Sequence, residues 1–190
     1  MANHHLRPQA HATGVGNTGS WSTMRIATCA LFVAVSLVAS FIELPIFPAA
    51  PWLKYDPSGI VCLIAGLAFG AGTGALVAVL SWLPHLFMDP FGGLVAILCA
   101  VALTVPAALV YHRWQSRPGA IVGMVVAACL TLGVAIGTNL VITPLYAGIS
   151  MQAVLAMIVP ILLPFNALKV LITCAATLAL YKPVSKLVGA

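Results

Sequence analysis

Long apolar stretches dominate this chain, and short polar segments separate them. The stretches run over residues 24–45, 58–88, 91–111, 119–143 and 153–181. Nearly all charged residues, turn residues and proline clusters lie between them. A helix needs roughly 20 apolar residues to cross a hydrocarbon core about 30 Å thick. The pattern therefore predicts an all-α integral membrane protein with about six spans.

The second apolar stretch, residues 58–88, is too long for one comfortable span. Its centre, residues 70–74, reads Gly-Ala-Gly-Thr-Gly, where glycine permits a tight turn between two helices. The first of these helices would be only about 20 Å long, so we expect neighbouring helices to shield it. The expected spans are 24–45, 58–70, 73–88, 91–111, 119–143 and 158–181.

The few charges orient these spans in the membrane. If residues 58–88 form two helices, six of the eight basic residues share one side, in line with the excess of Lys and Arg in cytoplasmic segments. These six are Arg7, Arg25, Arg113, Arg117, Lys182 and Lys186. The acids Glu43, Asp56 and Asp89 then lie at the outer face, whereas five spans would place Arg113 and Arg117 outside. We therefore predict a six-transmembrane-helix bundle with the N- and C-termini cytoplasmic.

Composition excludes a soluble domain, because 62% of the residues are hydrophobic and 6% are charged, against roughly 45–50% and about 25% in soluble domains. Residues 1–22 are polar and lack the apolar core of a secretory signal, so we expect a disordered cytoplasmic tail before a membrane domain at 23–190. His4, His5 and His11 in this tail leave metal binding as an alternative to a flexible tail. The basic residues form no patch that indicates nucleic-acid binding, and the five cysteines lack the paired spacing of a zinc or redox site.

An ionisable side chain inside a membrane helix is costly, so Lys169 is the first candidate for a functional residue. Asn166 lies three residues earlier on the same helical face. An ammonium and an amide together offer donors and an acceptor to a polar group of a ligand. The alternative is a lysine whose long stem carries its charge to the membrane interface.

A second polar group, Thr138 and Asn139, lies near the outer end of the fifth span. These side chains come to a depth similar to that of Lys169. They would either face a ligand together with Lys169 or hold two helices together by hydrogen bonds.

The outer loop at residues 43–58 carries several prolines, which stiffen it, and the aromatic residues Phe47, Trp52 and Tyr55. These rings would form a lid that stacks on a flat ligand, or they would belong to an interfacial aromatic belt.

The first span carries Ala27, Ala30 and Ala34, a stripe of small residues that lets the backbone of another helix approach closely. Such a stripe serves either as a partner surface or as packing inside the bundle. The sequence contains no nucleotide-binding loop, zinc-protease or serine-hydrolase motif. We therefore predict neither an enzyme nor a bound metal or cofactor.

Three stretches, taken in order, resemble the substrate-binding S components of energy-coupling factor (ECF) vitamin transporters, most closely the riboflavin-specific type. The first reads Phe41-Ile-Glu-Leu-Pro45 and continues with Leu53-Lys-Tyr-Asp56, Ser58 and Leu63-Ile-Ala-Gly-Leu-Ala-Phe-Gly70. The second holds Asn139, Pro144 and Tyr146. The third reads Leu163-Pro-Phe-Asn-Ala-Leu-Lys169 and ends in Leu180-Tyr-Lys-Pro183. The resemblance covers residues 24–186. The sequence departs from the family pattern at Gly59, where relatives commonly have an aspartate, and at residues 81–85.

The resemblance implies a six-helix fold with cytoplasmic termini and a ligand site that opens to the outside. It implies that Asn139, Asn166 and Lys169 bind riboflavin. Tyr55 and Asp56 would lie in the loop that covers the site.

The function that the resemblance implies is capture of riboflavin, as a transported ligand, at a prokaryotic plasma membrane. ATP-driven uptake would need a transmembrane coupling protein and two ATP-binding cassette ATPases, and the stripe of Ala27, Ala30 and Ala34 would dock on the coupling protein. Two alternatives stay open: an S component for another vitamin or small solute, and a structural or assembly membrane protein without a ligand.

Overall fold

The computed structural model describes residues 23–48 and 53–187. In these ranges the chain is helical and forms no strand beyond an isolated pairing of Leu44 with Tyr55, so the prediction of an all-α fold is confirmed. The predicted tail at residues 1–22, with Arg7 and its three histidines, lies outside the described residues. So do Trp52 and the side chains of Tyr146 and Lys186.

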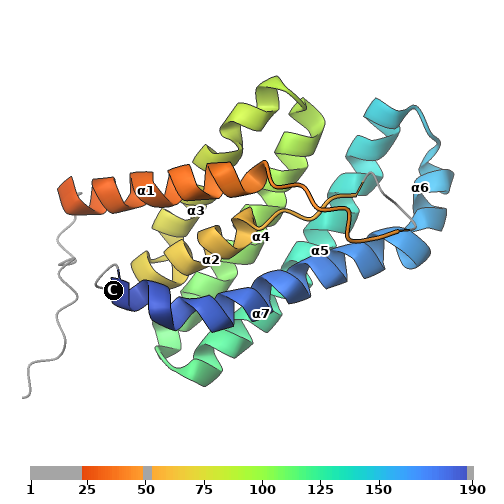
Figure 1. Ribbon diagram of the computed structural model, residues 1–190. Coiled ribbons are helices and arrows are strands. Elements are labelled where there is room, and N and C mark those ends of the chain that lie inside the picture. Colours follow the sequence, from red (N-terminus) through yellow and green to blue (C-terminus); the bar gives the residue numbers. More distant parts are fainter. Residues whose placement is uncertain (1–22, 49–52, 188–190) are drawn as a thin grey trace, which may run out of the picture.

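The helical elements cross one another in a bundle (Figure 1). In chain order they are α1 (Thr23–Ser40), α2 (Ser58–Phe69), α3 (Ala71–Trp82), the 3₁₀ helix η1 (Leu83–Phe87), α4 (Pro90–Trp114), α5 (Arg117–Ala147), α6 (Met151–Met157), the π-helix η2 (Ile158–Leu162) and α7 (Leu163–Leu187).

Four stretches of helix are long and apolar enough to cross a membrane. They are Thr23–Ser40, Pro90–Trp114, Arg117–Leu145 and Met151–Val184, the last of which runs through α6, η2 and α7. The shorter apolar helices are Ser58–Phe69 and Ala71–Phe87. The first of these, α2, lies between α1 and α7 in Figure 1 and also contacts α3 and α4. Leu63 and Ala65 of α2 are completely buried, so neighbouring helices shield this short element on several sides.

The chain turns from α2 into α3 at one residue, Gly70, whose φ of 98° and ψ of 164° suit glycine almost alone. The Gly70 N–H donates to the carbonyl of Gly66 (2.9 Å), and the Gly74 N–H donates to the carbonyl of Gly70 (3.0 Å). A β-carbon on Gly74 would lie 2.7 Å from the α-carbon of Gly66 and 2.5 Å from Cγ2 of Thr104. Glycine therefore makes the turn possible and also lets α2, α3 and α4 pack closely.

Helix α1 ends at Ser40, although the apolar stretch continues to residue 45. The Leu44 N–H donates to the Tyr55 carbonyl, and the Tyr55 N–H donates to the Leu44 carbonyl, both at 2.8 Å. A residue before proline avoids the helical conformation, and Leu44 precedes Pro45. The last five residues of this stretch therefore begin the loop that returns to α2.

Three contacts gather several helix ends at one end of the bundle. They are Arg25 Nη2 with Thr73 Oγ1 (3.3 Å), His112 Nε2 with the Gly66 carbonyl (3.3 Å), and the hydroxyls of Tyr111 and Tyr181 (3.2 Å). The start of α1, the α2–α3 corner, the end of α4 and the later part of α7 therefore lie together. In Figure 1 the first turn of α1 and the last turn of α7 are on the same side of the molecule.

Candidate ligand-binding site

A cavity of about 710 Å³ opens toward the other end of the bundle, where the loop between α1 and α2 folds back. Its walls come from the end of α1, this loop, η1 and helices α3, α4, α5 and α7. Small-molecule sites usually enclose roughly 300–1,000 Å³, so this cavity has the size of a ligand pocket.

An ion pair crosses the inner wall of the cavity and joins the loop to α7. Lys169 Nζ donates to Asp56 Oδ2 at 2.8 Å. The Asp56 side chain is 7% exposed, whereas the Lys169 side chain is 32% exposed and faces the cavity. The carboxylate is thus buried behind the ammonium, and the ammonium is accessible to a ligand.

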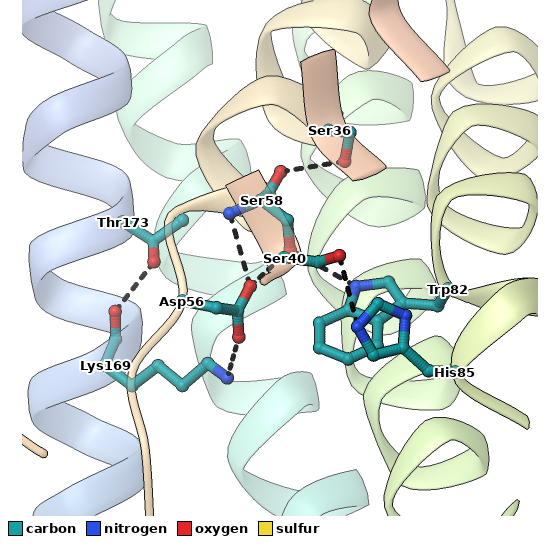
Figure 2. A network of polar contacts seen from close by, with 8 residues as sticks. All are labelled: Ser36, Ser40, Asp56, Ser58, Trp82, His85, Lys169 and Thr173. Atoms are coloured by element: carbon teal, nitrogen blue, oxygen red, sulfur yellow. Dashed lines mark hydrogen bonds and ion pairs between the residues drawn. The ribbon is translucent and has the colours of Figure 1, made fainter. Parts of the chain in front are cut away.

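Ser58 fixes the Asp56 carboxylate at the start of α2 (Figure 2). The Ser58 N–H donates to Asp56 Oδ1 at 3.2 Å, and the Ser58 hydroxyl donates to the same oxygen. An aspartate side chain that accepts a hydrogen bond from the backbone N–H two residues ahead is a common turn motif, the Asx-turn. The positive end of the α2 dipole favours this carboxylate as well. Trp82 Nε1 donates to Ser58 Oγ at 3.2 Å, so the network reaches from α7 to α3.

Three rings lie against one another next to this polar network. The His85 ring lies 4.5 Å from the Phe41 ring at an interplanar angle of 28°, and 4.5 Å from the Trp82 ring at 47°. His85 Nε2 is also 3.4 Å from the Ser40 hydroxyl (Figure 2). All three rings line the cavity, so a flat apolar group would find a preformed surface there.

Two side-chain amides lie on the wall that α5 and α7 form. Asn139 Nδ2 donates to the Ala135 carbonyl (2.7 Å), and Asn166 Nδ2 donates to the Leu162 carbonyl (2.8 Å). A carboxamide nitrogen carries two hydrogens, so each amide keeps a donor for a ligand. The Leu162 carbonyl belongs to the π-helix η2, and such segments are frequent at functional sites.

The structure brings four of the five predicted ligand residues to the cavity: Asp56, Asn139, Asn166 and Lys169. Tyr55 is 5% exposed and is not among the residues that line it. Burial raises the pKa of the Tyr55 phenol above its usual value, so this side chain is neutral at physiological pH. Its main chain instead ties the loop to Leu44.

The sequence did not reveal the ion pair or the stacked rings. Asp56 and Lys169 are 113 positions apart, and no local pattern links them. The contact between His85 and Phe41 depends on how the loop folds back. The acid in the loop and the lysine in a span, each unusual in an apolar chain, were the available signals.

Ala27, Ala30 and Ala34 are all exposed on one face of α1, away from the cavity. The opposite face of the same helix buries Cys29 and Phe32 against the core. The stripe therefore faces outward and does not pack inside the described bundle.

The cavity combines polar side chains on one wall with rings on another, which suits a ligand that has a flat apolar part and a polar part. Among residues 23–48 and 53–187, no group of three or more His, Cys, Asp or Glu side chains is placed to hold a metal ion.

Comparisons with known families, proteins and solved structures agree on one family. Residues 24–181 match the profile of the family described as ECF transporter, substrate-specific component. The chain is 29% identical over 167 residues to the riboflavin transporter RibU of Staphylococcus aureus (strain TCH60), which covers 83% of this chain and 88% of that protein. A solved structure of the S component of a bacterial ECF transporter has the same fold, with a TM-score of 0.75 and 24% identity over 86% of this chain and 96% of that one.

Proposed function

Because this chain belongs to the family of substrate-specific components of ECF transporters, we propose that it captures riboflavin outside the cell for ATP-driven uptake. The 29% identity to a riboflavin transporter, spread over most of both chains, supports this choice of vitamin. The family is one of transporter components and not of enzymes, so we expect binding without chemical change of the ligand.

One observation carries the proposal: a single cavity is lined both by polar side chains and by a cluster of three rings. The flat ring system of riboflavin would lie against Phe41, Trp82 and His85. Its ribityl hydroxyls would accept and donate hydrogen bonds at Asn139, Asn166 and Lys169. Asp56 and Tyr55 would hold the covering loop in place, the first through Lys169 and the second through its main chain.

The proposed topology has six spans and cytoplasmic termini. It is supported by the position of the first turn of α1 and the last turn of α7 at the same end of the bundle (Figure 1), as expected for an even number of crossings. Arg25, Arg113 and Arg117 belong to that end, whereas the cavity and Glu43 belong to the other. A membrane-impermeant maleimide should therefore label Lys54→Cys in intact cells and Ser116→Cys only after permeabilisation.

Substrate-specific components of ECF transporters work with a separate energising module. We propose that this module is a transmembrane coupling protein with two ATP-binding cassette ATPases, assembled in a prokaryotic plasma membrane. The sequence itself has no nucleotide-binding loop. Purified alone, the protein should bind riboflavin without transporting it.

Titration of riboflavin into detergent-purified protein tests the vitamin directly, because flavin fluorescence should be quenched when the ring stacks on aromatic side chains. Asn139→Ala and Asn166→Ala should each weaken binding by about 3–10-fold, the worth of one neutral hydrogen bond, and Lys169→Ala should weaken it further.

Thr138→Ala is the matched control, because Thr138 precedes Asn139 but donates to the Val134 carbonyl (2.7 Å) and does not line the cavity. It should leave riboflavin affinity unchanged. Well-folded protein that shows no quenching would rule out riboflavin and leave family membership intact. A thermal-shift panel of other vitamins would then find the ligand, since a bound ligand stabilises the folded state.

A further inference from the structure

The ammonium of Lys169, which faces the cavity, already has a negatively charged partner. Lys169 is paired with Asp56 at 2.8 Å, and two groups of Ser58 hold that carboxylate in place (Figure 2). An ammonium has three donor hydrogens, so Lys169 can bond a ligand hydroxyl without leaving Asp56.

The rim of the cavity adds no positive charge. Lys54 is paired with Glu43, and Asp89 caps α4 by accepting the Gly92 N–H at 3.0 Å. Among the described residues that line the cavity there are two lysines and three carboxylates. Residues 49–52 of the loop, which lie outside the described ranges, carry no charged side chain. The lysines and carboxylates therefore give the cavity a formal charge of −1.

An anionic ligand faces a specific obstacle in this arrangement. To bind Lys169 as a counterion, the anion must either share the ammonium with Asp56 or displace it. Sharing brings two negative groups together, and displacement leaves a carboxylate that is 7% exposed without its partner. An uncharged polyol meets neither difficulty.

We propose that Asp56 is a specificity-determining residue that acts through Lys169 and makes the cavity selective for uncharged ligands over their phosphorylated forms. This inference rests on the proposed function, because riboflavin and riboflavin 5′-phosphate are the natural pair for testing it. The two ligands share ring and chain and differ by a phosphate of about −1.5 to −2 charges at pH 7.

The experiment compares the dissociation constants of riboflavin and riboflavin 5′-phosphate by fluorescence titration in detergent at fixed ionic strength. Wild-type protein should bind riboflavin at least about tenfold more tightly than riboflavin 5′-phosphate. This ratio corresponds to a small part of the interaction energy of two full charges a few ångströms apart. Asp56→Asn keeps the size of the side chain and an acceptor for Ser58 but removes the charge. This variant should reduce the preference for riboflavin over riboflavin 5′-phosphate by about tenfold, chiefly because riboflavin 5′-phosphate binds more tightly.

Lys169→Met provides the opposite change, because it leaves the Asp56 charge facing the cavity without an ammonium. It should widen the preference for riboflavin, and it serves as the second variant if Asp56→Asn does not fold. Asp89→Asn removes the same charge from the exposed rim and keeps a good helix cap, so it should alter the preference less than about threefold.

Equal losses of affinity for both flavins in Asp56→Asn would show that Asp56 has a structural role only, and would overturn the inference. So would wild-type protein that binds both flavins equally well, although the proposed function would then stand. Wild-type protein that binds neither flavin would overturn the proposed function and this inference together.

Discussion

At the scale of single residues, the ion pair of Lys169 and Asp56 is the main electrostatic interaction of the candidate site. Each partner would be costly alone in an apolar bundle, and together they satisfy each other at 2.8 Å. The pair also connects the loop to α7, so the groups that form the ligand wall and the segment that folds over it share one interaction. Under the proposed function, stability and ligand binding are therefore coupled at this position.

Lys169→Met should lower the free energy of unfolding by about 1–3 kcal/mol, less than the 3–5 expected for a fully buried pair because part of Lys169 is exposed. The double variant Asp56→Asn, Lys169→Met should recover part of this loss, since no unpaired buried charge remains. Thermal unfolding in detergent without ligand measures both. Lys54→Met is the matched control, because its pair with Glu43 is exposed and should be worth under about 1 kcal/mol. Equal losses in the single and double variants would contradict this account.

At the scale of helices and loops, the apolar pattern was enough to predict an all-α chain, because a membrane demands both apolar residues and internally bonded backbone. The glycines at 70–74 likewise mark the place where α2 meets α3, since a φ of 98° excludes nearly every other residue. Apolarity does not report where a helix ends, however. Phe41, Ile42 and Leu44 are apolar, yet they lie outside α1, because Leu44 precedes Pro45 and pairs with Tyr55 in the loop.

The candidate site could be predicted only in part, for a related reason. Lys169, Asn166 and Asn139 are polar residues in apolar helices, which makes them conspicuous in the sequence. The position of Asp56 against Lys169, and of Phe41 against His85, depends on the return path of a loop with no periodic pattern. Long-range contacts of this kind follow from packing of the whole chain.

Three glycines at the corner between α2 and α3 separate the effect of backbone conformation from the effect of close packing. Gly70 has a positive φ, Gly74 lies against another backbone, and Gly72 has neither feature. Gly72→Ala should be neutral or stabilising by up to about 1 kcal/mol, because it is in a helix and nothing lies within 4 Å of its added β-carbon. Gly70→Ala should cost about 1–3 kcal/mol through backbone strain alone. Gly74→Ala should cost at least as much, since its β-carbon would meet the backbone of Gly66 at 2.7 Å.

Thermal unfolding of these three variants in detergent gives the comparison, with Gly72→Ala as the internal control. The order of stability should be Gly72→Ala, then Gly70→Ala, with Gly74→Ala no more stable than Gly70→Ala. A Gly70→Ala protein as stable as Gly72→Ala would show that the corner does not need a left-handed residue.

At the scale of the whole molecule, the cavity and the exposed stripe on α1 are separate features. The cavity opens at the end of the bundle where the loop folds back, and the stripe of Ala27, Ala30 and Ala34 faces sideways, where lipid or another membrane protein would contact it. A subunit that binds a ligand at one end and a partner along one side can perform both tasks at once. This separation makes the two tasks independently testable.

Ala30→Trp should abolish uptake of riboflavin by cells and co-purification with the coupling protein, because a large ring on the stripe prevents close approach of another helix. Riboflavin affinity of the purified variant should stay within about twofold, since the substituted side chain points away from the core and the cavity. Ala175→Trp on α7 is the matched control, because Ala175 is also an exposed alanine in the middle of a spanning helix. Uptake that survives Ala30→Trp would exclude the stripe as the docking surface, and loss of uptake in Ala175→Trp alone would place that surface on α7.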